Sequence, residues 1–161
     1  MRLRPATAAD DAFLQRVYAS SRQDELAQLP WSEAEKRAFL AMQFDAQDRH
    51  YRAHFPDARF DVVERGGVPI GRLIVERTED EIRLLDIALL PEHRGAGAGS
   101  ALLRELLAEA AASSKRVTIH VERANPARRL YERLGFRVEE DEDAIYLFMA
   151  WRPGDQAKTA S

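Results

Sequence analysis

The order of hydrophobic and polar residues predicts strands and helices in alternation. Apolar residues recur every three to four positions in four segments, as in amphipathic helices, and alternate or cluster in seven shorter segments, as in strands. The predicted helices include residues 7–20, 32–50, 102–110 and 126–134. The predicted strands cover residues 2–4, 59–64, 70–77, 81–90, 117–121, 136–138 and 144–150. This order favours one α+β domain over residues 1–151, followed by a flexible tail at 152–161.

Residues with known positional preferences support these boundaries. Thr7 suits the N-cap of the first helix, and Ser32 with Glu35 forms a capping box before the second. Gly66–Gly67 is typical of a hairpin turn between two strands. Pro126 suits the first turn of the short last helix. The chain therefore contains local signals for where most predicted elements begin or end.

Composition excludes several classes of function. The 161 residues carry a net charge of −3, so no basic surface for nucleic acid is expected. The absence of cysteine excludes disulfides and thiolate chemistry, and the four histidines show no zinc-binding spacing, so we expect no metal. No apolar run approaches the roughly 20 residues that cross a membrane. Because the N-terminal residues are too polar for a signal peptide, we expect a cytoplasmic protein.

A glycine-rich turn between a strand and a helix is the strongest chemical feature. Gly95, Gly97 and Gly99 alternate directly after an apolar strand and before the helical stripe that begins at Leu102. Backbone N–H groups that no side chain covers, at the positive end of a helix, can bind a phosphate. A dinucleotide-binding loop would need glycine where Ser100 stands, and a nucleoside-triphosphate loop would need a lysine that this turn lacks. A different phosphorylated cofactor is therefore expected.

Two motifs identify that cofactor by resemblance. The pattern Arg94-x-x-Gly97-x-Gly99, preceded by a strand and a proline, resembles the acyl-CoA pyrophosphate loop of the GNAT N-acetyltransferase superfamily. The segment 125–136, with an asparagine, a short helix containing a tyrosine, and then Gly-Phe, resembles that family's second motif. The resemblance implies a mixed, mostly antiparallel seven-stranded sheet flanked by about four helices. It also implies acyl transfer from acetyl-CoA, as co-substrate, to an amine.

The resemblance further implies which residues hold the cofactor. Main-chain groups of the strand end would contact the pantetheine arm, and loop amides would bind the pyrophosphate. Asn125 would hydrogen-bond the cofactor or the backbone nearby; alternatively, it is only a turn residue. The cofactor-binding residues expected on this basis are Ile87, Ala88, Leu89, Arg94, Gly95, Ala96, Gly97, Ala98, Gly99, Ser100 and Asn125.

The catalytic groups are less completely specified. Tyr131 matches the family tyrosine that protonates the leaving thiolate; the alternative is a tyrosine that only packs in the core. His120 is the preferred base, since histidine titrates near neutral pH. Glu122 lies on the same strand face, and Asp86 interrupts an apolar strand, so both are alternatives. An ordered water chain could also replace a dedicated base.

The acceptor is expected to be a primary amine of a small molecule or peptide. The segment 31–55 is predicted to cover the acceptor pocket, and the acidic run 139–143 is either a solvated hairpin tip or an attractor of cationic amines. Alternatives remain within the class: a succinyl-CoA donor paired with Arg52, Arg72 or Arg83, or a protein N-terminus or lysine as acceptor. A non-catalytic acyl-CoA sensor is the alternative outside it. Monomer and homodimer are both open.

Overall fold

The computed structural model describes residues 1–140 and 145–155. Its strands are β1 (Arg2–Pro5), β2 (Arg59–Arg65), β3 (Val68–Arg77), β4 (Glu81–Leu89), β5 (Arg116–Glu122), β6 (Arg137–Glu140) and β7 (Tyr146–Trp151). Its helices are α1 (Asp11–Ser21), α2 (Gln23–Ala27), α3 (Glu33–His54), α4 (Ala98–Ala112) and α5 (Arg128–Arg133), with 3₁₀ turns η1 (Ala8–Asp10) and η2 (Pro91–His93). Residues 141–143 of the predicted acidic hairpin, and 156–161 of the predicted tail, lie outside the described residues.

The seven strands form one sheet in the order β1-β2-β3-β4-β5-β7-β6. β4 and β5 are parallel, whereas β1 pairs with β2, and β7 with β5 and β6, in antiparallel fashion. This confirms the predicted α+β fold with its mixed, mostly antiparallel sheet. The predicted count of about four helices is close to the five α-helices of the described chain. The addition is α2, which is too short to produce a helical period in the sequence.

Helix α3 begins where the capping box predicts and ends later than predicted. The Ser32 hydroxyl accepts a hydrogen bond from the Glu35 amide at 3.1 Å, and the Glu35 carboxylate accepts one from the Ser32 amide at 3.3 Å. The helix runs to His54 instead of about residue 50. An ion pair from Asp48 to Arg52, 3.0 Å long and four residues apart, supports this last turn.

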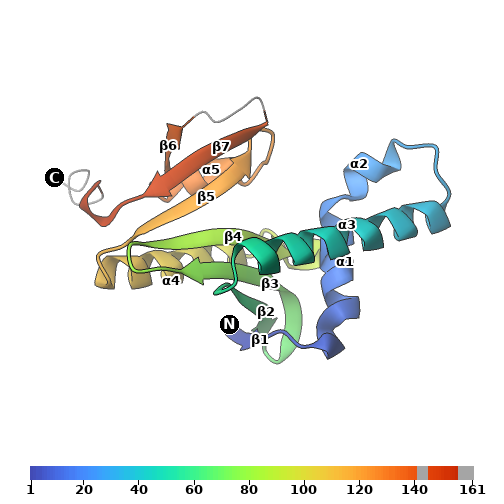
Figure 1. The fold of residues 1–161 in the computed structure, drawn as a ribbon, viewed down its shortest axis with the longest axis horizontal. Helices are drawn as coiled ribbons and strands as arrows, with labels where there is room; N and C mark the ends of the chain where they lie inside the picture. The colour runs from blue at the N-terminus through green and yellow to red at the C-terminus, as the bar shows by residue number, and fades with distance from the viewer. Residues whose placement is uncertain (141–144, 156–161) are drawn as a thin grey trace. The chain divides into compact units, whose positions relative to one another are not determined.

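The chain divides into two compact units. The first contains residues 1–74 and 86–96, and the second contains residues 75–85 and those from 97 onward. In the first unit α1 and α3 contact each other (Figure 1), with Val17 and Phe44 among the buried residues of these helices. Because each unit buries its own apolar side chains, the single domain over residues 1–151 stays a prediction.

The second unit is built on α4 and the C-terminal strands. The predicted apolar stripe of α4 is buried, and the helix contacts β5. β7 pairs with β5 along its whole length, from Trp151 opposite Val117 to Tyr146 opposite Glu122. Buried side chains from these three elements form the core of the unit; they include Leu102, Leu103, Leu106, Val117, Ile119, Leu147 and Met149.

The central strand β4 is irregular. At one end of the β3–β4 pair the Thr78 amide donates to the Glu81 carbonyl, and at the other end the Leu90 amide donates to the Ile70 carbonyl. Between these two hydrogen bonds the chain moves eight residues along β3 but nine residues along β4. One extra residue in β4 is what a β-bulge introduces. The parallel register with β5 covers Glu81–Leu84, and β4 then continues to Leu89. The strand that leads into the glycine-rich turn is therefore registered with β5 only in its first half.

Candidate functional site

The glycine-rich turn follows β4 through a short 3₁₀ turn. Leu90 is buried, and its amide donates to the Ile70 carbonyl at 2.9 Å, which fixes the end of the strand. After η2, Gly95 and Gly97 have φ values of 77° and 84°. These are left-handed conformations that favour glycine. Two of the three alternating glycines therefore adopt backbone conformations that other residues rarely take.

Helix α4 begins inside the predicted loop. Gly97 is its N-cap, and Ala98, Gly99 and Ser100 form its first turn, whereas the sequence suggested a helix that starts after the loop. The first amides of a helix have no partner within the helix. A Cβ placed on Gly95 or Gly97 would meet no atom of the described chain within 4 Å. Open space beside uncovered amides at a helix N-terminus fits a pyrophosphate group.

Arg94 connects the turn to the elements on either side of it. Its Nε donates to the Leu89 carbonyl at 2.9 Å, and one of its terminal nitrogens contacts the Ser20 hydroxyl at 3.4 Å. The side chain thus holds the turn against the end of β4 and against α1. The three predicted pantetheine-contacting residues of β4, which end at Leu89, are all partly buried.

β3 packs closely against the part of β4 that is predicted to contact the pantetheine arm. A Cβ on Gly71 of β3 would lie 2.2 Å from the Ala88 carbonyl oxygen and 2.7 Å from the Leu89 side chain. Any residue other than glycine at this position would push β3 away from β4. Sequence reasoning did not identify Gly71, because nothing in the local pattern indicates which strand faces it.

The second motif builds a turn and a short helix. The Asn125 side-chain oxygen accepts a hydrogen bond from the Ala127 amide at 2.9 Å, and its carbonyl accepts one from the Arg128 amide at 3.1 Å. This is an Asx-type turn that starts α5. Tyr131 on α5 is 3% exposed, and its ring meets Phe136 edge-on with centroids 5.6 Å apart. Asn125 therefore positions the helix that carries Tyr131.

His120 lies on β5, directly opposite Phe148 on β7. The two rings are 5.0 Å apart between centroids, and the histidine is exposed to solvent. Glu122 follows two residues later on the same strand. Of the predicted site residues, Ile87–Leu89 and Arg94–Ala96 belong to the first unit. Those from Gly97 onward, with His120, Asn125 and Tyr131, belong to the second.

A partly buried ion pair lies beside the β4 segment. The Arg72 Nε donates to the Asp86 carboxylate at 2.5 Å, and one terminal nitrogen donates to the Gln47 side-chain oxygen at 2.5 Å. Arg72 is 7% exposed. The sequence marks Asp86 as an acid within an apolar strand, but only the tertiary structure brings Arg72 of β3 to it and Gln47 of α3 to Arg72.

A second charge network lies in the second unit. Arg83 contacts Glu76 at 3.1 Å and Glu81 at 2.6 Å, and Glu81 also accepts a hydrogen bond from the Thr118 hydroxyl at 3.0 Å. Glu76 and Glu81 are both buried, so their charges need such partners. In the described part of the chain, no group of three or more histidine or acidic side chains is arranged to hold a metal ion. None of the described helices has the length and apolar character needed to span a membrane.

Comparison with known proteins identifies a family and several structures with a similar fold. Residues 20–136 match the model of the acetyltransferase (GNAT) family. The PaiA N-acetyltransferase of Thermoplasma acidophilum, solved in complex with coenzyme A, is 20% identical, with a TM-score of 0.69 over 94% of this chain and 98% of that one. An acetyltransferase of Thermus thermophilus is 21% identical, with a TM-score of 0.68 over 94% and 96% of the two chains.

The family match covers most of the chain, so the protein belongs to the GNAT acetyltransferase family. The two solved structures show the same fold. Membership makes the chain an acyltransferase with acetyl-CoA as its co-substrate, which confirms the predictions of enzyme class and cofactor. The acceptor and the roles of individual residues are separate questions.

Proposed function

We propose that this enzyme transfers the acetyl group of acetyl-CoA to a primary amine of a small molecule or peptide by direct attack. The observation that carries the proposal is the turn from Arg94 to Ser100, which opens into α4 with space beside two left-handed glycines. When bound, acetyl-CoA supplies the acyl thioester. The protein must then hold the cofactor, deliver a deprotonated amine and protonate the sulfur that leaves.

Main-chain groups hold the cofactor in this proposal. The amides from Arg94 to Ser100 bind the pyrophosphate, and the strand end Ile87–Leu89 offers backbone groups to the pantetheine arm, as a sheet edge does to an added strand. The Arg94 side chain acts on the protein itself, because it is bonded to the Leu89 carbonyl. Asn125 acts indirectly, through the turn that starts α5.

Tyr131 is the proposed proton donor to the leaving sulfur. A phenol can protonate a thiolate, and burial beside Phe136 fixes the direction of the ring. The new N–C bond forms as the C–S bond breaks, and the amine loses one proton while the sulfur gains one. Both proton transfers need a positioned group.

His120 is the proposed acceptor of the amine proton. Its ring is exposed, so a proton taken from the amine can pass on to water. Asp86 is the weaker alternative, because its carboxylate is already bonded to the Arg72 guanidinium at 2.5 Å. Glu122 remains an alternative on the same strand, and a water chain would make all three dispensable.

The arrangement of arginines supports an acetyl over a succinyl donor. A succinyl group would need a cation for its free carboxylate. Each arginine considered for that role is already ion-paired: Arg52 with Asp48, Arg72 with Asp86, and Arg83 with both Glu76 and Glu81. Expectations of a cytoplasmic location, of monomer or homodimer, and of no membrane or nucleic-acid partner stay predictions. So does attraction of cationic amines by residues 139–143.

Ligand-induced thermal stabilisation tests the proposal first. A ligand at a hundredfold excess over its Kd stabilises the native state by about 2.7 kcal/mol. We expect acetyl-CoA to raise the Tm, succinyl-CoA to raise it less, and ATP to leave it unchanged. Since the chain contains no cysteine, a thiol reagent then detects only released CoA during an amine screen. Stabilisation without thiol release from any amine would favour an acyl-CoA sensor instead.

A further inference from the structure

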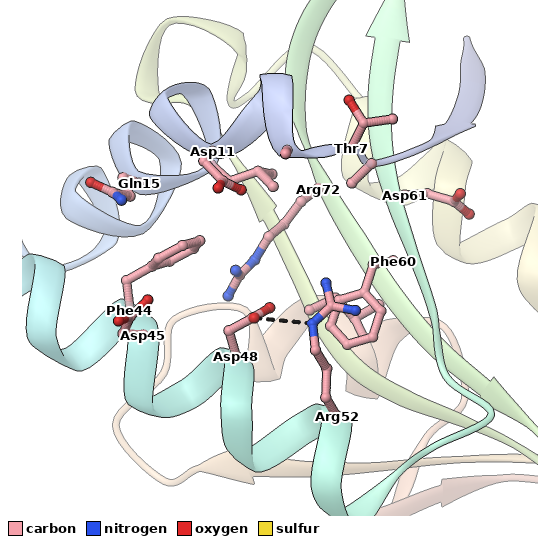
Figure 2. A pocket seen from close by; sticks show the side chains of 14 residues that line it. Thr7, Asp11, Gln15, Phe44, Asp45, Asp48, Arg52, Phe60, Asp61 and Arg72 are labelled. Carbon is pink, nitrogen blue, oxygen red and sulfur yellow. Dashed lines mark hydrogen bonds and ion pairs between the residues drawn. The ribbon is translucent and has the colours of Figure 1, made fainter.

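A cavity of about 320 Å³ lies within the first unit, between its helices and its strands. Figure 2 shows side chains from α1, α3, β2 and β3 around it, among them Asp11, Asp48, Phe60 and Arg72. Ligand pockets of folded proteins measure about 300–1,000 Å³. This volume lies at the lower end of that range and therefore suits a small molecule.

Arg72 gives the cavity a donor nitrogen that no described protein group occupies. The residue is 7% exposed, and in Figure 2 its side chain points from β3 into the space bounded by α1 and α3. Nε is bonded to Asp86 and Nη2 to Gln47. Nη1 has no hydrogen-bond partner among the described residues. This nitrogen is not among the buried unpartnered atoms of the described chain, so solvent reaches it from the cavity, and a ligand oxygen could accept its hydrogen bond in place of water.

Asp11 contributes an exposed acid to the cavity lining. Four aspartates and two arginines line the cavity, and three of the aspartates are paired: Asp45 with Arg49, Asp48 with Arg52, and Asp61 with Arg59. Within the described chain, the Asp11 carboxylate has no ion-pair or hydrogen-bond partner. The cavity thus contains one open cationic donor and one open carboxylate.

We propose that this cavity binds a free α-amino acid. The carboxylate of the ligand accepts a hydrogen bond from Arg72 Nη1, and its ammonium group pairs with Asp11. Apolar surface from Phe44, Phe60 and Ile74 is available to the ligand side chain. A plain anion would meet an excess of two aspartates in the lining, and a plain cation would leave Nη1 without a partner. This proposal does not rest on the proposed acyl transfer.

The test uses the full chain and ligands with one carbon skeleton. The twenty L-amino acids are first screened by thermal shift, with acetyl-CoA measured separately as the readout of the cofactor site. Calorimetric titration then compares L-leucine with isopentylamine, which lacks its carboxylate, and with 4-methylpentanoate, which lacks its ammonium group. We expect L-leucine to bind at least about tenfold more tightly than either analogue, since each loses one charge-assisted hydrogen bond.

Matched variants assign the binding to these residues. Asp11→Asn should weaken L-leucine about tenfold, whereas Asp24→Asn, which also alters an exposed acid in the first turn of a helix, should leave the affinity unchanged. Arg72→Lys keeps the charge but lacks the second terminal nitrogen, and it should weaken L-leucine and 4-methylpentanoate together. If no amino acid shifts the Tm, or if isopentylamine binds as tightly as L-leucine, the proposal is wrong. A failure of acetyl-CoA to bind would instead bear on the cofactor turn alone.

Discussion

The hydroxyl group of Tyr131 is needed for a catalytic role but not for a role in packing. Because the ring is buried against Phe136, Tyr131→Phe keeps the ring packing and removes the hydroxyl that the mechanism needs. We expect kcat to fall about a hundredfold or more, with the acetyl-CoA shift in Tm unchanged. Steady-state kinetics and thermal shift on the same preparation check both statements. Tyr18→Phe is the matched control, since Tyr18 is also buried and its hydroxyl contacts Gln43 at 3.4 Å.

Gly97 distinguishes a cofactor turn from a simple strand–helix connection. Alanine at φ 84° costs about 1–2 kcal/mol of stability, while asparagine tolerates this conformation. Both side chains project into the space proposed for the pyrophosphate. We therefore expect Gly97→Ala to lower the Tm, Gly97→Asn to lower it less, and both to weaken acetyl-CoA binding. Normal acetyl-CoA affinity in Gly97→Asn would contradict the proposed role of the turn.

At the scale of elements, the pairing of β3 with β4 depends on Gly71. A Cβ there would lie 2.2 Å from the Ala88 carbonyl oxygen, so Gly71→Ala must displace one strand. We expect a loss of about 1–3 kcal/mol in the free energy of unfolding, as for other overpacked sites, and weaker acetyl-CoA binding because β4 carries Ile87–Leu89. Urea unfolding and titration with acetyl-CoA measure the two effects. Gly154→Ala, with no atom within 4 Å of the added carbon, should change neither.

Elements with strong local patterns could be predicted from the sequence, and contacts between elements could not. The hairpin turn between β2 and β3 and the capping box of α3 depend on neighbouring residues, and both lie where the sequence predicts them. The single helix predicted at 7–20 is instead η1 followed by α1, with Asp10 bonded to the Thr7 amide at 2.8 Å. A change from 3₁₀ to α geometry leaves almost the same apolar period, so the sequence does not distinguish them.

The candidate site also has parts that the sequence predicts and parts that only the structure shows. The glycine turn and the Asn125–Phe136 segment are continuous in sequence, so residue types and spacing were enough to locate them. The bond from Arg72 to Asp86 and Gln47 joins three elements that only the tertiary fold brings together. The sequence shows Asp86 as an unusual acid, but its hydrogen-bond partner is a cation 14 residues away. Roles that depend on such partners need the structure.

At the scale of the whole molecule, one carboxylate in each unit makes the free energy of unfolding depend on pH in the acid range. Hydrogen bonds from the Arg4 guanidinium hold the pKa of Asp10 well below its usual range, and a hydrogen bond from Arg77 lowers the pKa of Glu109. A carboxyl whose pKa is lower in the folded than in the unfolded state stabilises the fold above its unfolded pKa. That stabilisation is lost as the pH falls through the folded pKa.

Stability should therefore decline from about pH 5 downward, as carboxylates that are ionised in the fold become protonated in the unfolded chain. Asp10→Asn and Glu109→Gln should each lower the urea midpoint at pH 7, and the difference from the unmodified chain should shrink toward pH 2. Glu105→Gln is the control on α4, because the described structure gives Glu105 no ion-pair partner. If the deficit of both variants stayed constant from pH 7 to pH 2, their effect would come from packing and not from the charge of these two carboxylates.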